Sequence, residues 1–179
     1  MSVLFVDLVG FTAASEQADP EDVRARLRPY HARVKLEIER FGGTVEKFVG
    51  DAVMAVFGAP VAHEDDAERA VSSALRILAA IDELNDEHPG LELAVRGAVN
   101  TGEAMVTLSA RPAEGEGMVA GDVVNTAARI EESVAGAGQI VISRATFDRL
   151  AGQIPAVSLG PVALRGRSES VEMFEIPPD

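Results

Sequence analysis

The order of apolar patterns along the first hundred residues restricts the fold of this chain more than any other feature. Short runs that are apolar, or that alternate between apolar and polar residues, predict strands, and apolar stripes that recur every three or four residues predict helices. The strand-like runs are residues 3–9, 44–49, 52–57 and 91–99, and the helical stripes lie within residues 20–41 and 64–86. The order strand, helix, strand, strand, helix, strand is typical of the ferredoxin-like βαββαβ unit, in which two helices cover one face of an antiparallel sheet.

The rest of the chain extends this α+β core. A loop rich in Gly, Glu and Pro is followed by further strands and helices. The strands are expected at residues 103–108, 139–143, 157–165 and 170–176, the loop at 109–118, and the helices at 121–135 and 144–151. We therefore predict an extended, mostly antiparallel sheet with C-terminal β/α additions. In this interpretation residues 1–176 form one domain, residues 177–179 begin a linker, and the domain is part of a larger multidomain protein.

Composition excludes several classes of function. Of the 179 residues, 47% are hydrophobic and 25% are charged, which is typical of a soluble globular domain. The formal net charge of −13 argues against nucleic acid as a partner, because nucleic-acid sites set Lys and Arg against phosphates. No apolar run approaches the roughly 20 residues of a membrane span, so no membrane insertion by this chain is expected.

Cysteine and histidine usage restricts the metal chemistry and the compartment. The chain has no cysteine, which rules out disulfides and thiolate metal sites. Its three histidines, His31, His63 and His88, are scattered along the sequence, which argues against a zinc site. The first residues lack the positive charge and the cleavage site of a signal peptide, so we expect a cytoplasmic protein.

Two aspartates are notable because they lie within or between apolar strands. Asp7 interrupts the first strand, and it is equally consistent with a metal ligand and with a residue that ends the strand. Asp51 follows Gly50 between two strands, where turn geometry alone would explain it. In a βαββαβ sheet, however, the first and third strands are neighbours, so the two carboxylates would face each other. Carboxylates that close repel unless a divalent cation lies between them, and Mg²⁺ favours one or two carboxylates together with substrate phosphates.

The segment after the first strand predicts a contact with phosphate. Gly10 allows a close backbone approach, and the free amides of Gly10, Phe11 and Thr12 would attract phosphate where the strand gives way to a helical turn. The segment is not a P-loop of the Walker A type, because neither Gly-Lys-Ser nor Gly-Lys-Thr occurs in the chain.

Three segments together resemble the motifs of the class III adenylyl and guanylyl cyclase catalytic domain. Residues 5–12 (FVDLVGFT) resemble the first metal motif, and residues 47–58 (KFVGDAVMAVFG) resemble the second. Residues 121–129 (GDVVNTAAR) resemble the third, which lies on a helix and carries residues that act on the transition state. The motifs have the order and spacing of the family and span nearly the whole chain. The loop at residues 111–118 is similar to that of a cyclase subgroup fused to ATPase and helical-repeat regions.

The resemblance implies an adenylate cyclase that converts ATP to 3′,5′-cyclic AMP and pyrophosphate in sites shared across a homodimer. It implies that Asp7 and Asp51, with the Leu8 carbonyl, hold two Mg²⁺ ions, for which Mn²⁺ can substitute. It also implies that Lys47 contacts adenine from the partner subunit, since lysine here goes with adenylyl cyclases and glutamate with guanylyl cyclases. A lysine donor suits adenine, whose N1 is an acceptor, whereas guanine presents an N–H at that position.

On the predicted third helix, the resemblance implies that Asn125 orients the ribose and that Arg129 stabilises charge on the triphosphate. Their separation of four residues puts both side chains on one face of the helix. Near the C-terminus, residues 164–167 (LRGR) resemble the segment that supplies another triphosphate-binding cation, and this role falls to either Arg165 or Arg167.

One position departs from the family pattern and keeps a second function open. The second residue that selects the base is usually Asp or Thr, but here it is Met118, a poor hydrogen-bond acceptor for the adenine amino group. The alternative is a weakly active or inactive cyclase-homology domain that acts as a nucleotide-sensing or dimerisation module. A diguanylate cyclase, which has a related sheet, is not supported because the chain has no GGDEF-like turn.

Overall fold

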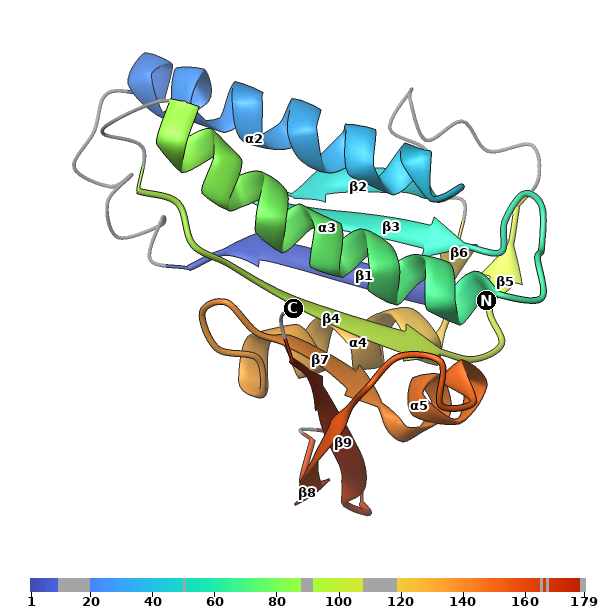
Figure 1. The fold of residues 1–179 in the computed structure, drawn as a ribbon. Coiled ribbons are helices and arrows are strands. Elements are labelled where there is room, and N and C mark those ends of the chain that lie inside the picture. The colour runs from blue at the N-terminus through green and yellow to red at the C-terminus, as the bar shows by residue number, and fades with distance from the viewer. Residues whose placement is uncertain are drawn as a thin grey trace.

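A seven-stranded sheet with helices on both faces forms the core of the chain (Figure 1). The computed structural model describes residues 1–9, 20–49, 51–87, 92–107, 119–164, 166 and 168–177. The strands are β1 (Ser2–Leu8), β2 (Thr44–Val49), β3 (Ala52–Phe57), β4 (Val95–Thr101), β5 (Met105–Val106), β6 (Val119–Ala120), β7 (Ile140–Ser143), β8 (Val157–Val162) and β9 (Val171–Ile176). The helices are α2 (Pro20–Arg40), α3 (Asp66–Glu87), α4 (Asp122–Ser133) and α5 (Arg144–Leu150).

The sheet confirms the predicted topology. Its strand order is β2-β3-β1-β4-β7-β9-β8, and β1 pairs antiparallel with β3 on one edge and with β4 on the other. The pairing of β4 with β7 is parallel, and the other neighbouring pairs in this sheet are antiparallel. The first half is therefore a βαββαβ unit, and β7, α5, β8 and β9 are the C-terminal β/α additions.

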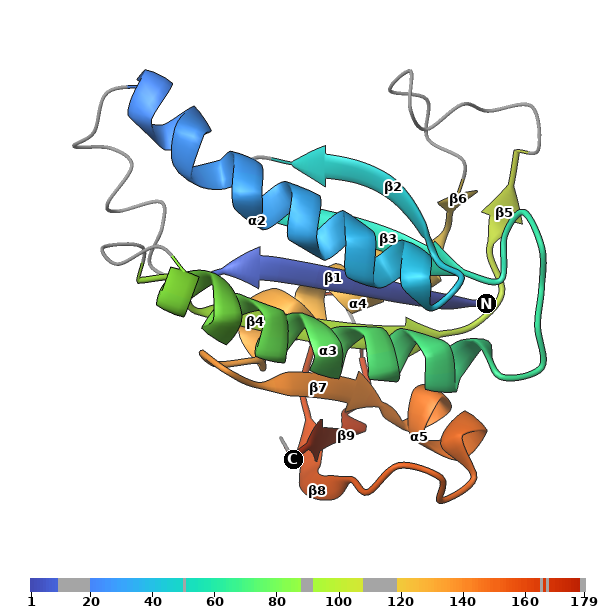
Figure 2. The ribbon, with the colours of Figure 1, turned by 45° about the horizontal axis from the view of Figure 1, so that its top comes forward.

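The helices are divided between the two faces of the sheet. α2 and α3 lie side by side across one face, and α4 lies on the opposite face (Figures 1 and 2). The alternation of side chains along β1 supplies both interfaces. Leu4 and Val6 pack into the core beneath α2 and α3, whereas Val3 packs with Val123 and Ala127 of α4.

The sequence explains why these helices form and stop where they do. α2 begins at Pro20, a residue favoured at the first position of a helix because its missing N–H would have no intrahelical partner. Tyr30, Val34 and Ile38 lie four residues apart and are buried, which gives α2 its apolar face. The helix stops before Gly42, whose φ of 82° is a left-handed conformation that favours glycine. None of the helices among the described residues is long and apolar enough to cross a membrane.

The structure changes the predicted arrangement around Gly102. β4 begins at Val95 rather than residue 91 and continues to Thr101, and β5 pairs with β6 in a separate two-stranded sheet. β5 does not extend the main sheet beside β4, because β1 and β7 already occupy both edges of β4. The predicted loop at residues 109–118 lies outside the described residues. The four helices of the described residues begin and end within two residues of the predicted positions.

Candidate active site

Asp7 is the second-last residue of β1, and the alternation of the strand determines where its side chain points. Val6 and Leu8 face the core beneath α2 and α3, so Asp7 faces the side of the sheet that α4 covers. The register of β1 and β4 places Asp7 opposite Arg96, and Asp7 Oδ2 lies 3.6 Å from Arg96 Nη2. Asp7 Oδ1 is buried and has no hydrogen-bond partner among the described residues.

Asp51 lies in the turn between β2 and β3. The hydroxyl of Tyr30, a fully buried residue of α2, donates a hydrogen bond to the Asp51 carbonyl at 3.1 Å and so anchors this turn. Burial raises the pKa of the Asp51 carboxyl, and the negative charge of Asp7 raises it further. The two carboxylates therefore lie close together at one end of the sheet, as the order of the strands predicted.

A third carboxylate, which the sequence patterns did not indicate, lies beside them. Glu131 of α4 is 3% exposed, and its Oε1 lies 2.6 Å from Arg96 Nε. Burial raises the pKa of Glu131 to about 8, the charge of Asp7 adds to the rise, and Arg96 opposes it. Arg96 also donates a hydrogen bond from Nη1 to the backbone carbonyl of Glu132 at 3.4 Å. One arginine thus contacts two carboxylates and the backbone of α4.

The end of the sheet that holds Asp7 and Asp51 fits a divalent cation. Asp7 Oδ1 is a buried acceptor with no partner among the described residues, and the neighbouring Asp51 carboxyl has a raised pKa that a bound cation would lower. Carboxylate oxygens suit Mg²⁺ and Mn²⁺, and Mg²⁺ takes few protein ligands when phosphates supply the rest. The described residues contain no group of three or more His, Asp or Glu side chains placed to hold a metal. The two aspartates would therefore bind metal together with the phosphates of a ligand.

Asn125 and Arg129 lie on the side of α4 that faces away from the sheet. Asn125 is exposed and Arg129 is partly exposed, whereas the buried residues of the helix are Val123, Thr126, Ala127, Ile130 and Glu131. A Cβ atom added to Gly166 would lie 3.1 Å from Arg129 Nη1, so the guanidinium of Arg129 lies against the segment that resembles a triphosphate-binding motif. Arg165 and Arg167, which flank that glycine, lie outside the described residues.

Lys47 is exposed on β2 and lies on the same face of the sheet as Asp7. Lys47 is opposite Met54 in the register of β2 and β3, and Met54 is opposite Phe5 in the register of β1 and β3. Cross-strand partners share a face of a sheet, and Phe5 is two residues from Asp7 on β1. The candidate base contact and the candidate metal ligands thus belong to one surface.

Glu46, the residue before Lys47, connects this surface to β6. A bulge interrupts the register of β2 and β3 at this point, and Glu46 is only 3% exposed. Its Oε1 accepts a hydrogen bond from the backbone N–H of Val119 at 3.2 Å, which ties β2 to the residue after Met118. Six residues with predicted substrate contacts lie outside the described residues, and these contacts stay predictions: Gly10, Phe11, Thr12, Met118, Arg165 and Arg167.

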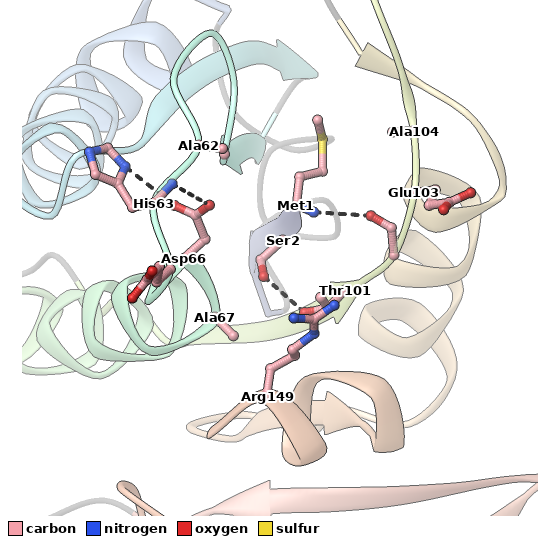
Figure 3. A pocket seen from close by; sticks show the side chains of 13 residues that line it. Met1, Ser2, Ala62, His63, Asp66, Ala67, Thr101, Glu103, Ala104 and Arg149 are labelled. Atoms are coloured by element: carbon pink, nitrogen blue, oxygen red, sulfur yellow. Dashed lines mark hydrogen bonds and ion pairs between the residues drawn. The ribbon is translucent and has the colours of Figure 1, made fainter. Parts of the chain in front are cut away.

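A cavity of about 530 Å³ lies at the other end of β1 (Figure 3). Met1 and Ser2 line it, and Arg149 points toward it from α5. Asp7 is five residue positions beyond Ser2 on β1, which corresponds to roughly 17 Å of strand. The lining has charges of both signs, with Glu64, Asp66 and Glu103 beside Arg149. This cavity is therefore separate from the carboxylate pair and offers no single charge preference for a ligand.

Comparison of the chain with known proteins decides its family. Residues 1–177 match the adenylate and guanylate cyclase catalytic domain. The chain belongs to this family. The match spans β1, the turn with Asp51 and α4, so the three motifs that indicated a cyclase lie within one matched domain.

Relatives of both nucleotide specificities resemble this cyclase domain. Adenylate cyclase 1 of Rhizobium meliloti (strain 1021) is 30% identical over 180 residues, which cover 98% of this chain and 27% of that protein. The crystal structure of the adenylyl cyclase CyaB from P. aeruginosa is 30% identical, with a TM-score of 0.90 over 99% of this chain and 93% of that one. The guanylate cyclase domain of RhGC from Catenaria anguillulae, solved with GTP, is 28% identical, with a TM-score of 0.85 over 99% of this chain and 95% of that one.

The sequence patterns did not identify Arg96, Glu131 and Glu46 as part of the site. Arg96 carries a signal, because it is the one charged residue of β4. Glu131 follows the buried Ile130 and lies four residues after the buried Ala127, so helical spacing places it on the buried side of α4. Glu46 has no comparable signal, because a bulge, which local alternation does not predict, determines where it points.

We expect the metal-free cyclase domain to lose stability as the pH rises toward 8. The folded-state pKa of Glu131 is raised from 4.5 to about 8, so the folded protein holds a proton there that the unfolded chain has already released. This contribution to stability is fully present below the ordinary pKa of Glu131 and is lost as the pH rises through about 8. Thermal melts in EDTA across this window should show the fall, and Glu131→Gln should make it shallower.

Two controls identify the cause of the pH dependence. Mg²⁺ should also reduce the fall, because a cation beside Asp7 removes the charge that raises the pKa of Glu131. Glu132→Gln, a change at an exposed neighbour, should keep the wild-type profile. An unchanged profile in Glu131→Gln would show that another group is responsible.

Proposed function

We propose that this cyclase domain is an adenylate cyclase, which converts ATP to 3′,5′-cyclic AMP and pyrophosphate in sites shared by two copies of the chain. The observation that carries the proposal is the pair of neighbouring carboxylates, Asp7 and Asp51, at the end of β1, with a buried oxygen of Asp7 that has no hydrogen-bond partner among the described residues. Carboxylates placed in this way suit a pair of metal ions that act on a triphosphate.

The residues of the chain would divide the work between metal binding and charge stabilisation. Asp7 and Asp51, with the Leu8 carbonyl, would hold two divalent cations, which when bound activate the ribose 3′-hydroxyl and neutralise the phosphates. Asn125 would orient the ribose so that its 3′-oxygen is in line with the α-phosphorus and the departing pyrophosphate. Arg129 would stabilise the charge that develops on the phosphates. No side chain becomes covalently attached in this reaction.

The two faces of α4 support a site that is shared across a dimer. Glu131 is on the side of α4 that contacts the sheet and meets Arg96, which in turn contacts Asp7. Asn125 and Arg129 are on the side that faces away from the sheet. These two side chains therefore point away from the Asp7 of their own chain, and a second copy with its metal aspartates against this surface would complete the site.

Lys47 favours ATP over GTP as the substrate. Its ammonium group can only donate hydrogen bonds, and adenine N1 is an acceptor. Because both adenylyl and guanylyl cyclases are among the similar proteins, the base preference rests on the pocket residues of this chain rather than on the family.

Replacing either metal aspartate should abolish turnover and leave the fold intact. Asp7→Ala and Asp51→Ala each remove a metal ligand at the end of a strand. Each substitution reduces charge repulsion and leaves the packing of the core unchanged. Cyclic AMP formation with Mn²⁺ should fall by at least about a hundredfold, while the melting temperature stays the same or rises. Asp148→Ala, an exposed aspartate on α5, is the matched control and should keep full activity. Near-normal turnover in either site variant contradicts the metal assignment.

Chains with complementary lesions should restore activity when they are mixed. Asp7→Ala and Arg129→Ala homodimers have both sites broken, whereas a mixed dimer carries both lesions in one site and leaves the other intact. An equal mixture should reach about a quarter of the wild-type rate, because half of its dimers are mixed and each of these has one working site. The measurement is cyclic AMP formation by the mixture and by each variant alone. A mixture that stays inactive although mixed dimers form contradicts the shared site.

Position 118 should control how strongly ATP is preferred over GTP. With Met118 the adenine amino group lacks a strong acceptor, and a neutral hydrogen bond is worth about 0.5–1.5 kcal/mol, so the preference should be lower by roughly three- to tenfold. Met118→Asp should raise the ratio of kcat/KM for ATP to that for GTP, and Met118→Thr should raise it without adding a charge. If neither variant changes the ratio, position 118 does not face the base.

A further inference from the structure

Arg96 connects the metal-binding end of β1 to α4. Its guanidinium lies 3.6 Å from Asp7 Oδ2 and 2.6 Å from Glu131 Oε1, and it donates a hydrogen bond to the Glu132 carbonyl at 3.4 Å. Asp7 and Arg96 are cross-strand partners, so neither can move far while β1 and β4 remain paired. Glu131 and Glu132 belong to α4, so the contacts of Arg96 with these two residues attach the helix to the sheet.

The helix that receives these contacts has a different function on each side. Glu131 is buried against the sheet, two residues after Arg129, and therefore lies about 200° around the helix from it. Arg129 and Asn125 are on the opposite side of the helix. In the proposed function they act in the site whose metal-binding aspartates belong to the partner subunit. A rigid helix of this length transmits a shift on its inner side to its outer side.

We propose that Glu131 is a positioning residue that couples the two sites of the dimer: through Arg96 it links the metal ligand Asp7 of one site to the helix that presents Asn125 and Arg129 to the other. This inference rests on the proposed function, because it requires sites that are shared between two chains. It assigns a function to the contact between Arg96 and the buried Glu131, which the reaction itself does not use.

The sign of the coupling follows from the competition for Arg96. Without metal, the negative charge of Asp7 draws the guanidinium away from Glu131, so the hold of Arg96 on α4 is weakened. Divalent cations on Asp7 and Asp51 cancel the attraction of Asp7 and repel Arg96, which leaves the guanidinium to Glu131. Metal binding in one site therefore tightens the anchor of α4 and favours the placement of Asn125 and Arg129 in the other site.

Two mixed dimers with the same intact site test this coupling. The first pairs an Asp7→Ala chain with an Arg129→Ala chain, and the second pairs an Asp51→Ala chain with the same Arg129→Ala chain. In both, all lesions fall in one dead site, and the intact site takes Asn125 and Arg129 from the chain that lacks an aspartate. Without Asp51 the remaining Asp7 does not hold the metal ions, so the two dimers differ in whether that chain keeps a negatively charged Asp7 to compete for Arg96. Different affinity tags on the two chains allow the mixed dimers to be purified, and kcat and KM are measured at saturating metal.

The dimer with Asp7→Ala should have the higher kcat, because Arg96 in that chain is left to Glu131. We expect a difference of at least about fivefold, the lower end of measured coupling between sites, with little change in KM for ATP. Adding Glu131→Gln to the chain that lacks an aspartate should make the kcat values of the two dimers equal. Adding Glu132→Gln instead should preserve the difference, since only the backbone carbonyl of Glu132 contacts Arg96.

The outcomes separate the coupling from the proposed function. If Glu131 contributed only to the structure, Glu131→Gln would lower the kcat of both mixed dimers by the same factor. This result overturns the coupling. Equal kcat in the two starting dimers, or a difference that persists with Glu131→Gln in a protein with normal melting, overturns it as well. Two purified mixed dimers that are both inactive overturn the shared site itself, and the coupling with it.

Discussion

Repulsion among neighbouring carboxyl groups, of which Glu131 is buried and Asp7 and Asp51 are half-buried, is the constraint on which the rest of this site depends. Asp7, Asp51 and Glu131 gather at one end of the sheet, where burial and the charge of Asp7 raise the pKa values of the other two. Arg96 lies among them and offsets part of this charge. A cluster of this kind opposes folding, and it persists because paired strands and a packed helix hold its members in place. Carboxyl groups with pKa values raised in this way are typical of functional sites, and at Asp7 and Asp51 a bound cation would supply the missing positive charge.

The register of β1 determines which side chains reach the cluster. β1 is paired on both edges, with β3 and with β4, so its register is specified twice. A slip of one residue would turn Asp7 into the core beneath α2 and α3 and would place an apolar side chain at the metal-binding position. Val6 and Leu8 therefore do more than stabilise the domain, because their burial under the two helices fixes the direction of the carboxylate between them.

The fold and the pair of aspartates were predictable because they depend on local periodicity and on the order of the elements. β2 and β3 have the bounds that alternation predicted, and the proximity of Asp7 and Asp51 followed from the neighbouring strands. The contacts of Arg96 with Glu131, and of Glu46 with β6, were not predictable in this way. They depend on how α4 is rotated on the sheet and on a bulge in β2, and packing between distant segments determines both.

The central position of β1 also affects the order in which the sheet can form. β1 is synthesised before the other strands of its sheet, and its partners are Ala52–Phe57 and Val95–Thr101. Until Thr101 has left the ribosome, β1 has at least one open edge beside apolar side chains, and open edges of this kind favour aggregation. Pairing across such long separations is slow compared with the formation of helices. The strand that carries Asp7 is thus completed late, and a chain truncated before β4 would keep both aspartates without the sheet that holds the first of them in place.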